Sequence, residues 1–271
     1  MNIVSYRKPC RVITLVAGAS VVFCGTLAAQ PMRNAAGAHR ILAAQATAPE
    51  KKAMDFETPD FEMTLASDSQ TVVALKPKGG EGFDFAPSDR ASVRSGDGFY
   101  NLGDLTLRLR TAGSNSWTDY STAARRKPVT IVAPQGGDLA AADITPTLGD
   151  GFPLQVTRTW STDGGRLSLH FTVHNPTAVA VEIGALGIPM VFNNIITDRT
   201  LEQAHAACSF SDPYIGQDGG YLQVTRLTGK GPALVVVPDG HTPFEGYQLL
   251  QEPMRPNQTF DSLAIWSPGT S

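Results

Sequence analysis

Apolar and polar side chains alternate at every second position in two segments of the chain. The apolar positions are Leu105, Leu107 and Leu109 within residues 102–110, and Leu167, Leu169, Phe171 and Val173 within residues 166–175. Successive side chains of a β-strand point to opposite faces, so a period of two indicates a strand with one buried face. We therefore predict that both segments are strands whose apolar side chains enter a common core.

Shorter runs of β-prone residues, separated by Gly, Pro, Asp and Asn, occupy most of the chain from residue 56 onward. The Gly-containing segment 161–165 is suited to the loop of a hairpin. No helical pattern alternates with these runs, as a parallel sheet would require. The predicted fold is therefore all-β, a large antiparallel β-sandwich. Its additional predicted strands span residues 71–75, 129–133, 154–160, 178–186, 221–227, 233–237 and 246–250.

One segment, residues 199–208, has helical periodicity. Leu201, Ala204 and Cys208 share one face at this spacing. Thr200 is suited to cap the N-terminus, because a threonine hydroxyl can accept a hydrogen bond from an unpaired backbone N–H of the first turn. We predict one short helix near 199–208.

The first 28 residues have the three parts of an export signal. Arg7, Lys8 and Arg11 form a basic start, residues 12–28 are uncharged and mostly apolar, and small residues around Ala28 provide a cleavage point. An uncleaved membrane anchor is the alternative. We predict a signal peptide over 1–28, a secreted or periplasmic location, and no membrane attachment after cleavage. The Ala-rich stretch 29–54 is predicted as a flexible tether to a sandwich domain at 55–271.

The net charge limits the kinds of partner that the protein can bind. The chain has 271 residues, with 22 Lys and Arg against 25 Asp and Glu, so its formal charge is −3. Removal of residues 1–28 takes away three basic residues and no acidic ones, which leaves −6. This balance excludes a nucleic-acid-binding protein that relies on a basic surface, and no nucleic-acid partner is predicted. A hydrophobic share of 42% also excludes a disordered chain.

The sequence contains no pattern that specifies a cofactor. The five histidines are dispersed, metal-ligand spacing is absent, and neither a nucleotide-binding fingerprint nor a Gly-x-Ser-x-Gly elbow occurs. We predict no metal and no cofactor. Cys208 is the one cysteine left after signal cleavage. A nucleophilic role would need a base such as His205, and buried packing is the favoured interpretation.

The densest group of polar and aromatic residues lies in residues 209–221 and is predicted to be a loop. Asp212, Tyr214, Asp218 and Tyr221 are our candidates for binding a sugar there. Sugar rings stack on aromatic planes, and their hydroxyls form hydrogen bonds with carboxylates. The alternative is that the aspartates make turn hydrogen bonds and the tyrosines pack in the fold.

Three more polar residues complete the candidate set. Asn193 and Asn194 form either a strand-end turn or a pair of amide ligands, and Glu245 is an isolated acid beside aromatic residues. Glycoside hydrolysis needs two carboxylates roughly 5–10 Å apart, and Glu245 would supply one of them if it lay near Asp212 or Asp218. The tryptophans are predicted to be core or interface residues: Trp117, Trp160 and Trp266.

Residues 83–90, 101–110, 182–194 and 212–226 carry a resemblance to a known family. They resemble the N-terminal β-sandwich region of an uncharacterised, glycosidase-like family of large secreted bacterial and fungal proteins with a domain of unknown function. The resemblance covers roughly residues 54–268. It implies a sandwich of the galactose-mutarotase type, a supersandwich, usually followed by an α/α toroid that holds the catalytic acids. The chain stops at Ser271, so we expect that helical domain of full-length relatives to be missing, and no catalytic residue is carried over.

Three functions follow from these observations. The first is a secreted β-sandwich module of a carbohydrate-active, glycoside hydrolase-like protein, which binds a polysaccharide or oligosaccharide and is non-catalytic alone. The second is a glycosidase or sugar epimerase that acts with carboxylates on the face of the sandwich. The third is the structural half of a larger, truncated enzyme, stable when packed on a helical partner domain.

Overall fold

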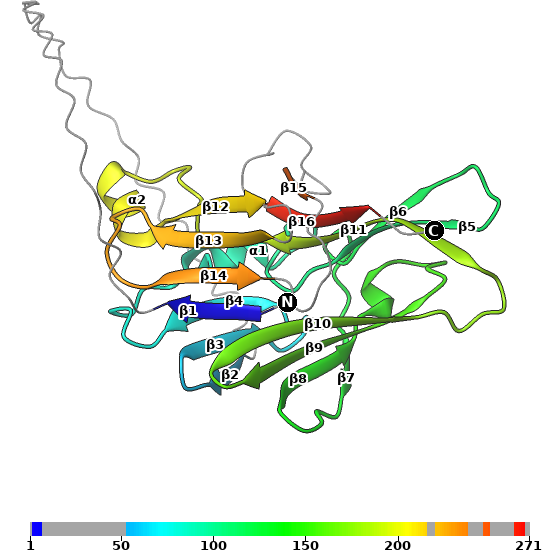
Figure 1. Cartoon of the computed structure of the whole chain (residues 1–271), viewed down its shortest axis with the longest axis horizontal. Helices are drawn as coiled ribbons and strands as arrows, with labels where there is room; N and C mark the ends of the chain where they lie inside the picture. Colours follow the sequence, from blue (N-terminus) through cyan, green and yellow to red (C-terminus); the bar gives the residue numbers. More distant parts are fainter. Residues whose placement is uncertain (1, 7–52, 216–219, 238–245, 250–262, 269–271) are drawn as a thin grey trace, which may run out of the picture. The chain divides into compact units, whose positions relative to one another are not determined.

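A computed structural model describes residues 2–6, 53–215, 220–237, 246–249 and 263–268, whose strands form three sheets with antiparallel pairing throughout (Figure 1). The largest sheet has eight strands in the order β12-β13-β14-β1-β10-β9-β8-β7. Its members are β1 (Asn2–Tyr6), β7 (Thr130–Val132), β8 (Asp138–Asp143), β9 (Gln155–Asp163), β10 (Arg166–His174), β12 (Ser209–Ile215), β13 (Gly220–Arg226) and β14 (Ala233–Val237).

Two smaller sheets complete the fold. The five-stranded sheet has the order β15-β16-β11-β5-β6, and the three-stranded sheet has the order β2-β3-β4. The five strands are β5 (Thr106–Thr111), β6 (Thr118–Ser121), β11 (Val181–Met190), β15 (Gly246–Leu249) and β16 (Leu263–Pro268). The three strands are β2 (Ala53–Glu57), β3 (Phe61–Ala66) and β4 (Val72–Pro77).

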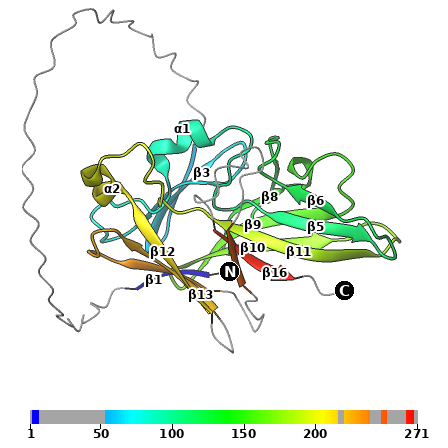
Figure 2. The same ribbon diagram turned by 90° about the horizontal axis from the view of Figure 1, so that it is seen from above.

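Both smaller sheets pack against the apolar face of the eight-stranded sheet, which makes the predicted sandwich. In one part of the core, the leucines of β5 meet residues of β8, β9 and β10, and Figure 2 shows β5 and β11 beside β9 and β10. In the other part, residues of β3 and β4 meet residues of β10, β13 and β14. Phe171 on β10 belongs to both parts, so one continuous interior joins them. The all-β antiparallel sandwich is confirmed.

The strands predicted from strict alternation are present. Leu107 and Leu109 on β5 are buried, as is Leu105 directly before this strand. On β10, Leu167 and Leu169 are buried while Phe171 and Val173 are half-buried. β9 and β10 form a hairpin in register from Gln155–His174 to Asp163–Arg166. The two glycines between them, Gly164 and Gly165, have φ values of 54° and 85°. A two-residue turn with positive φ at both positions matches the twist of the flanking strands, which is why glycines occupy it.

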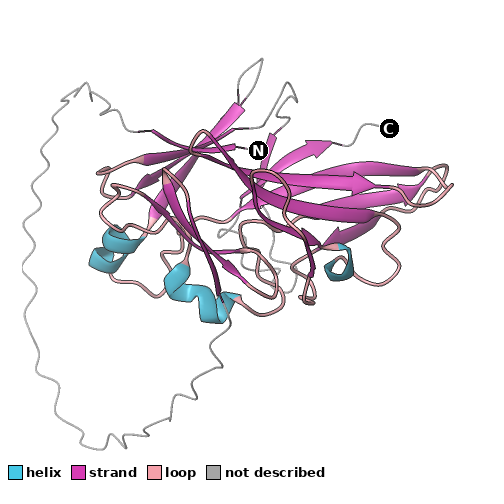
Figure 3. Cartoon of the chain, turned by 90° about the horizontal axis from the view of Figure 1, so that it is seen from below, coloured by secondary structure: helices cyan, strands magenta, loops and turns pink. Residues whose placement is uncertain are grey.

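The predicted helix is also present, as α2 (Leu201–Ala207). The hydroxyl of Thr200 accepts a hydrogen bond from the Gln203 N–H, and the Gln203 side chain accepts one from the Thr200 N–H, which forms a capping box. The predicted apolar face is wrong at Leu201, because this side chain is 76% exposed while Ala204 and Cys208 are buried. Figure 3 shows the helical segments in the connections between strands; they include α1 (Ala91–Arg94) and the 3₁₀ turns η1 (Ser88–Arg90) and η2 (Thr145–Thr147).

The structure departs from the sequence pattern in residues 209–221, which were predicted to be a loop. They belong to the paired strands β12 and β13, apart from residues 216–219, which lie outside the described residues. The predicted tether, 29–54, is described only where β2 begins at Ala53, and the predicted signal peptide only at β1. Within the described segments, the structure holds no helix with the length and apolar character needed to cross a membrane.

Candidate functional site

The hairpin of β12 and β13 presents one face to the core and the other to solvent. Leu222 and Val224 point into the core and have no exposed surface. Because side chains alternate along a strand, the neighbouring positions form the opposite face. We call this the outer hairpin face, and it consists of Phe210, Asp212 and Tyr214 on β12 and of Tyr221, Gln223 and Thr225 on β13.

Two tyrosines form the aromatic part of the outer hairpin face. Tyr214 and Tyr221 are directly opposite each other in the register of β12 and β13. Their rings are stacked, with centroids 5.0 Å apart and planes inclined by 4°. Tyr214 is 58% exposed, and Phe210 on the same strand is 57% exposed. Exposed aromatic side chains of this size offer a flat apolar surface that a ligand can cover.

Polar groups lie next to this aromatic surface. Asp212 is exposed and lies opposite the half-buried Gln223 in the register, one pair away along the same face from Tyr214 and Tyr221. The carboxylate accepts hydrogen bonds, while the amide both donates and accepts them. A hydroxyl-rich ring that covered a tyrosine would therefore find acceptors and a donor at its edge.

The structure brings together three of the predicted sugar-binding residues: Asp212, Tyr214 and Tyr221. Asp218 and Glu245 lie outside the described residues. Phe210 was missed because residues 209–221 were predicted to be a loop, and Gln223 was missed because its strand, predicted over 221–227, was not expected to pair with that segment. The period-two spacing of Phe210, Asp212 and Tyr214 was the signal that could have identified their shared face.

The predicted pair Asn193 and Asn194 lies in the connection that follows β11, which ends at Met190. Asn193 is buried, and its side-chain oxygen accepts a hydrogen bond from Arg199 at 3.3 Å. Its backbone N–H donates to the Phe85 carbonyl at 2.7 Å, and its carbonyl accepts from the Ser209 N–H at 2.7 Å. These internal bonds favour the turn interpretation over that of amide ligands for Asn193.

A buried ion network lies under the loops that follow β3 and precede β5. Asp104 accepts hydrogen bonds from the Thr122 hydroxyl at 2.7 Å and from the Asn101 N–H at 2.7 Å, and it forms an ion pair with Arg126 at 2.7 Å. Arg158, also buried, donates to the Gly103 carbonyl at 2.6 Å. Burial lowers the pKa of the Arg158 guanidinium to about 10, while the Asp104 carboxylate opposes that shift.

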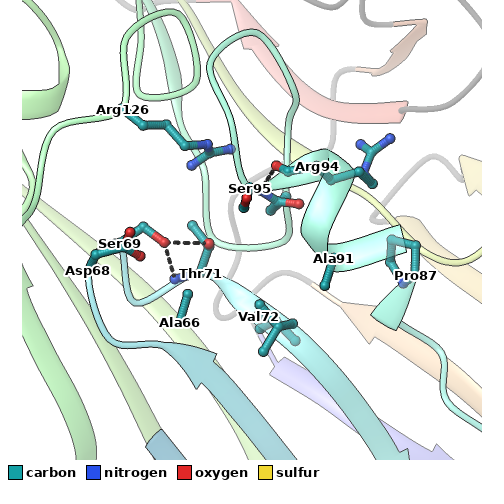
Figure 4. A pocket seen from close by; sticks show the side chains of 12 residues that line it. Ala66, Asp68, Ser69, Thr71, Val72, Pro87, Ala91, Arg94, Ser95 and Arg126 are labelled. Carbon is teal, nitrogen blue, oxygen red and sulfur yellow. Dashed lines mark hydrogen bonds between the residues drawn. The ribbon is translucent and has the colours of Figure 1, made fainter. Parts of the chain in front are cut away.

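A solvent-open hollow of about 360 Å³ borders this network (Figure 4). Ser69, Thr71, Arg94 and Arg126 contribute polar atoms to its wall. Arg126 donates to Asp104 and to the carbonyls of Gly96 and Phe99, and Arg94 donates to the Tyr100 carbonyl at 2.6 Å. Because these guanidinium groups bind backbone carbonyls and a carboxylate of the protein itself, the hollow is best explained as part of a structural network that ties the loops together.

Metal binding has no support in the part of the chain that the structure describes. There, no group of three or more His, Cys, Asp or Glu side chains is close enough to hold an ion. The exposed hairpin of β12 and β13, with its stacked tyrosines, is the candidate functional site.

Comparison with known proteins identifies the family. Residues 64–268 match the model of a family of unknown function, DUF5695. The chain belongs to this family. The DUF5695 match covers most of the range in which the sequence resembled an uncharacterised family, and it confirms that prediction. A comparison with curated proteins found no match.

The DUF5695 chain also shares its fold with a protein of known structure, a polysaccharide lyase. The two align with a TM-score of 0.59 at 15% sequence identity, over 80% of this chain and 30% of the lyase. At this identity the likeness shows the fold alone. The DUF5695 chain thus spans less than a third of the length of the lyase that it matches.

Cys208 of the DUF5695 chain has the surroundings of a packed thiol. It has no exposed surface, and its Sγ–H donates to the Ile195 carbonyl at 3.3 Å. Burial raises the pKa of the Cys208 thiol above its ordinary value of 9.0, and Arg199 only partly offsets this. Since the thiolate is the nucleophile, a raised pKa works against reactivity.

We expect Cys208 to resist thiol reagents until the protein unfolds. In a chain with Cys10→Ser and Cys24→Ser, labelling at pH 8 should be slow in buffer and rapid in denaturant. Because the thiol ionises more easily in the unfolded chain, its contribution to stability is fully present below pH 9.0 and declines as the pH rises further. Equal labelling rates in the folded and unfolded protein would instead indicate an accessible thiolate.

Proposed function

We propose that this chain is a secreted carbohydrate-recognition module that binds a polysaccharide or oligosaccharide on the outer hairpin face and is non-catalytic alone. The observation that carries the proposal is the stacked pair Tyr214 and Tyr221, beside Asp212 and Gln223 on one exposed face. The apolar C–H face of a sugar would cover an aromatic ring, while its hydroxyls would bind the carboxylate and the amide.

The fold supports a carbohydrate ligand, because a polysaccharide lyase shares it. The export signal predicted over residues 1–28 supports action outside the cytoplasm. Hydrolysis of a glycosidic bond needs two carboxylates that flank it. On the described part of the outer hairpin face the carboxylate is that of Asp212, which favours binding over hydrolysis.

The proposal predicts that Tyr214→Ala weakens binding about tenfold, which corresponds to roughly 1.4 kcal/mol. The substitution removes half of the stacked pair without opening the core, since Tyr214 is largely exposed. Affinity electrophoresis against a panel of neutral and acidic polysaccharides identifies the ligand, and isothermal titration with oligosaccharides measures the affinity. Reducing-sugar release in the same mixtures separates binding from hydrolysis.

Trp117→Ala is the matched control, because Trp117 is an exposed aromatic residue outside this face, between β5 and β6. It should bind as tightly as the unmodified chain, and circular dichroism should show that both variants are folded. The proposal fails if no polysaccharide is retained at millimolar sugar, or if Tyr214→Ala binds as tightly as Trp117→Ala.

A further inference from the structure

Strand β1 is the middle strand between two parts of the eight-stranded sheet (Figure 1). It pairs with β14 from Asn2 opposite Val237 to Tyr6 opposite Ala233. On its other side it pairs with β10, with Ile3 opposite Leu167. Since β10 and β14 are not neighbours in the sheet, β1 alone joins β12-β13-β14 to β10-β9-β8-β7. We call the position that it fills the strand slot.

The walls of the strand slot belong to the core. Leu234 and Val236 on β14, and Leu167 on β10, have no exposed surface and lie in one hydrophobic cluster. Ile3 is opposite both Val236 and Leu167 in the register, and Ser5 is opposite Leu234. Directly opposed residues of antiparallel strands share a face of the sheet. The strand slot therefore suits an occupant with an apolar residue at the first of these positions and an apolar or small residue at the second.

The occupant of the strand slot in this structure comes from the segment that the sequence marks for removal. Residues 2–6 lie within the predicted signal peptide, 1–28. Cleavage would take β1 away and leave the facing edges of β10 and β14 with unpaired N–H and C=O groups between buried side chains. Unpaired backbone groups in such a place are costly, and an open strand edge is a template for pairing with another chain.

We propose that, after the leader is removed, the strand slot accepts an extended segment of a partner polypeptide by strand addition. The partner segment runs antiparallel to both β14 and β10 and is apolar or small at alternate positions. Main-chain hydrogen bonds on both sides give it affinity, and the buried side of the strand slot gives it specificity. A polypeptide strand is the occupant that fits, because both sides of the strand slot are strand edges that carry buried apolar side chains, Leu167 on one and Leu234 and Val236 on the other.

Peptide exchange on the full chain tests this. A site for a specific protease, introduced within residues 30–50, lets the folded protein be cut between β1 and β2. The probe is a fluorescent synthetic peptide with the sequence of residues 1–8. We expect the cut protein to take up the probe, and the uncut protein to exclude it because its own β1 fills the strand slot. A probe with Ile3→Asp and Ser5→Asp should bind about 100-fold more weakly, because it buries charge without a partner.

The matched control is a probe with Val4→Asp. Val4 is opposite the half-buried Val235, on the other face of the sheet, so this probe should lose less than about tenfold. The proposal is overturned if the cut, folded protein takes up no probe, if the uncut protein takes up as much, or if all probes bind alike.

If cutting unfolds the protein, a disulfide cross-link in the uncut chain tests whether β1 occupies the strand slot. Val4→Cys with Val235→Cys, in a chain with Cys10→Ser and Cys24→Ser, should form a disulfide, because the two positions are directly opposite. Val4→Cys with Val179→Cys should not form one. Failure of the first pair to cross-link would show that the strand slot does not hold β1. Neither experiment involves a sugar, so their outcome is independent of the proposed function.

Discussion

Asp104→Ala is expected to lower the free energy of unfolding by about 3–5 kcal/mol, because it removes the buried partner of Arg126. The carboxylate has almost no exposed surface, and the ion pair that it forms with Arg126 at 2.7 Å is largely buried. The substitution removes the Asp104 carboxylate from beside that guanidinium and takes away the acceptor at 2.7 Å from both the Thr122 hydroxyl and the Asn101 N–H. Buried donors that lose their acceptor cost more than the net value of the bond itself.

The reference for this loss is Asp119→Ala. Asp119 accepts two hydrogen bonds from Arg108, at 2.7 and 2.8 Å, so the pair has similar geometry, but both side chains are more than half exposed. An exposed pair of this kind contributes at most about 1 kcal/mol. Urea unfolding followed by circular dichroism gives both values. Losses of equal size would show that the Asp104 network contributes no more than a surface ion pair.

The second large effect is expected for Trp160→Ala, at about 3–5 kcal/mol. Trp160 has no exposed surface, and its indole N–H donates to the Gln70 carbonyl at 3.1 Å. Its ring also lies against the backbone at Gly103, where an added Cβ would come within 3.0 Å of the ring and where φ is +104°. Alanine would leave a cavity between β9 and the three-stranded sheet and an unpaired carbonyl at residue 70.

Trp117→Ala provides the comparison for this residue. Trp117 is 40% exposed and lies against the Arg110 guanidinium, 4.3 Å from its ring centroid. Loss of an exposed cation–π contact costs about 1 kcal/mol or less. Thermal unfolding should therefore show a much larger loss of stability for Trp160→Ala than for Trp117→Ala. Similar losses would contradict the placement of Trp160 in the core.

The strands that could be predicted are those with one buried face, because apolar and polar residues then alternate along the segment. The alternation around Leu107 and Leu169 marks strands that cover the core with one face, and Gly164 and Gly165 mark the turn between two of them. Strand β13 was predicted, but β12 was missed because Ser211 and Pro213 occupy its other face, so the alternation there is not one of apolar and polar residues.

For the candidate site too, the residue types could be read from the sequence, but their arrangement depends on contacts between segments that are distant in the chain. Asp212, Tyr214 and Tyr221 were predicted from the kinds of residue present, but their shared face depends on the register of two strands. No pattern of neighbouring residues in the sequence indicates the ion network. Asp104 and Arg126 are 22 residues apart, and Arg158 binds a carbonyl 55 residues away.

The amino-acid sequence by itself determined the strand conformation of the alternating segments, the glycine turn between β9 and β10, and the Thr200 cap of α2. These are properties of a few adjacent residues, because side-chain periodicity, positive φ and a capping hydroxyl act within one turn or one strand. Only the tertiary structure decided that β5 pairs with β11, that Tyr214 stacks on Tyr221, and that a segment from the predicted leader lies between β10 and β14. Backbone pairing is chemically alike for all strands, so the choice of partner depends on which faces must be buried together once the whole chain has folded.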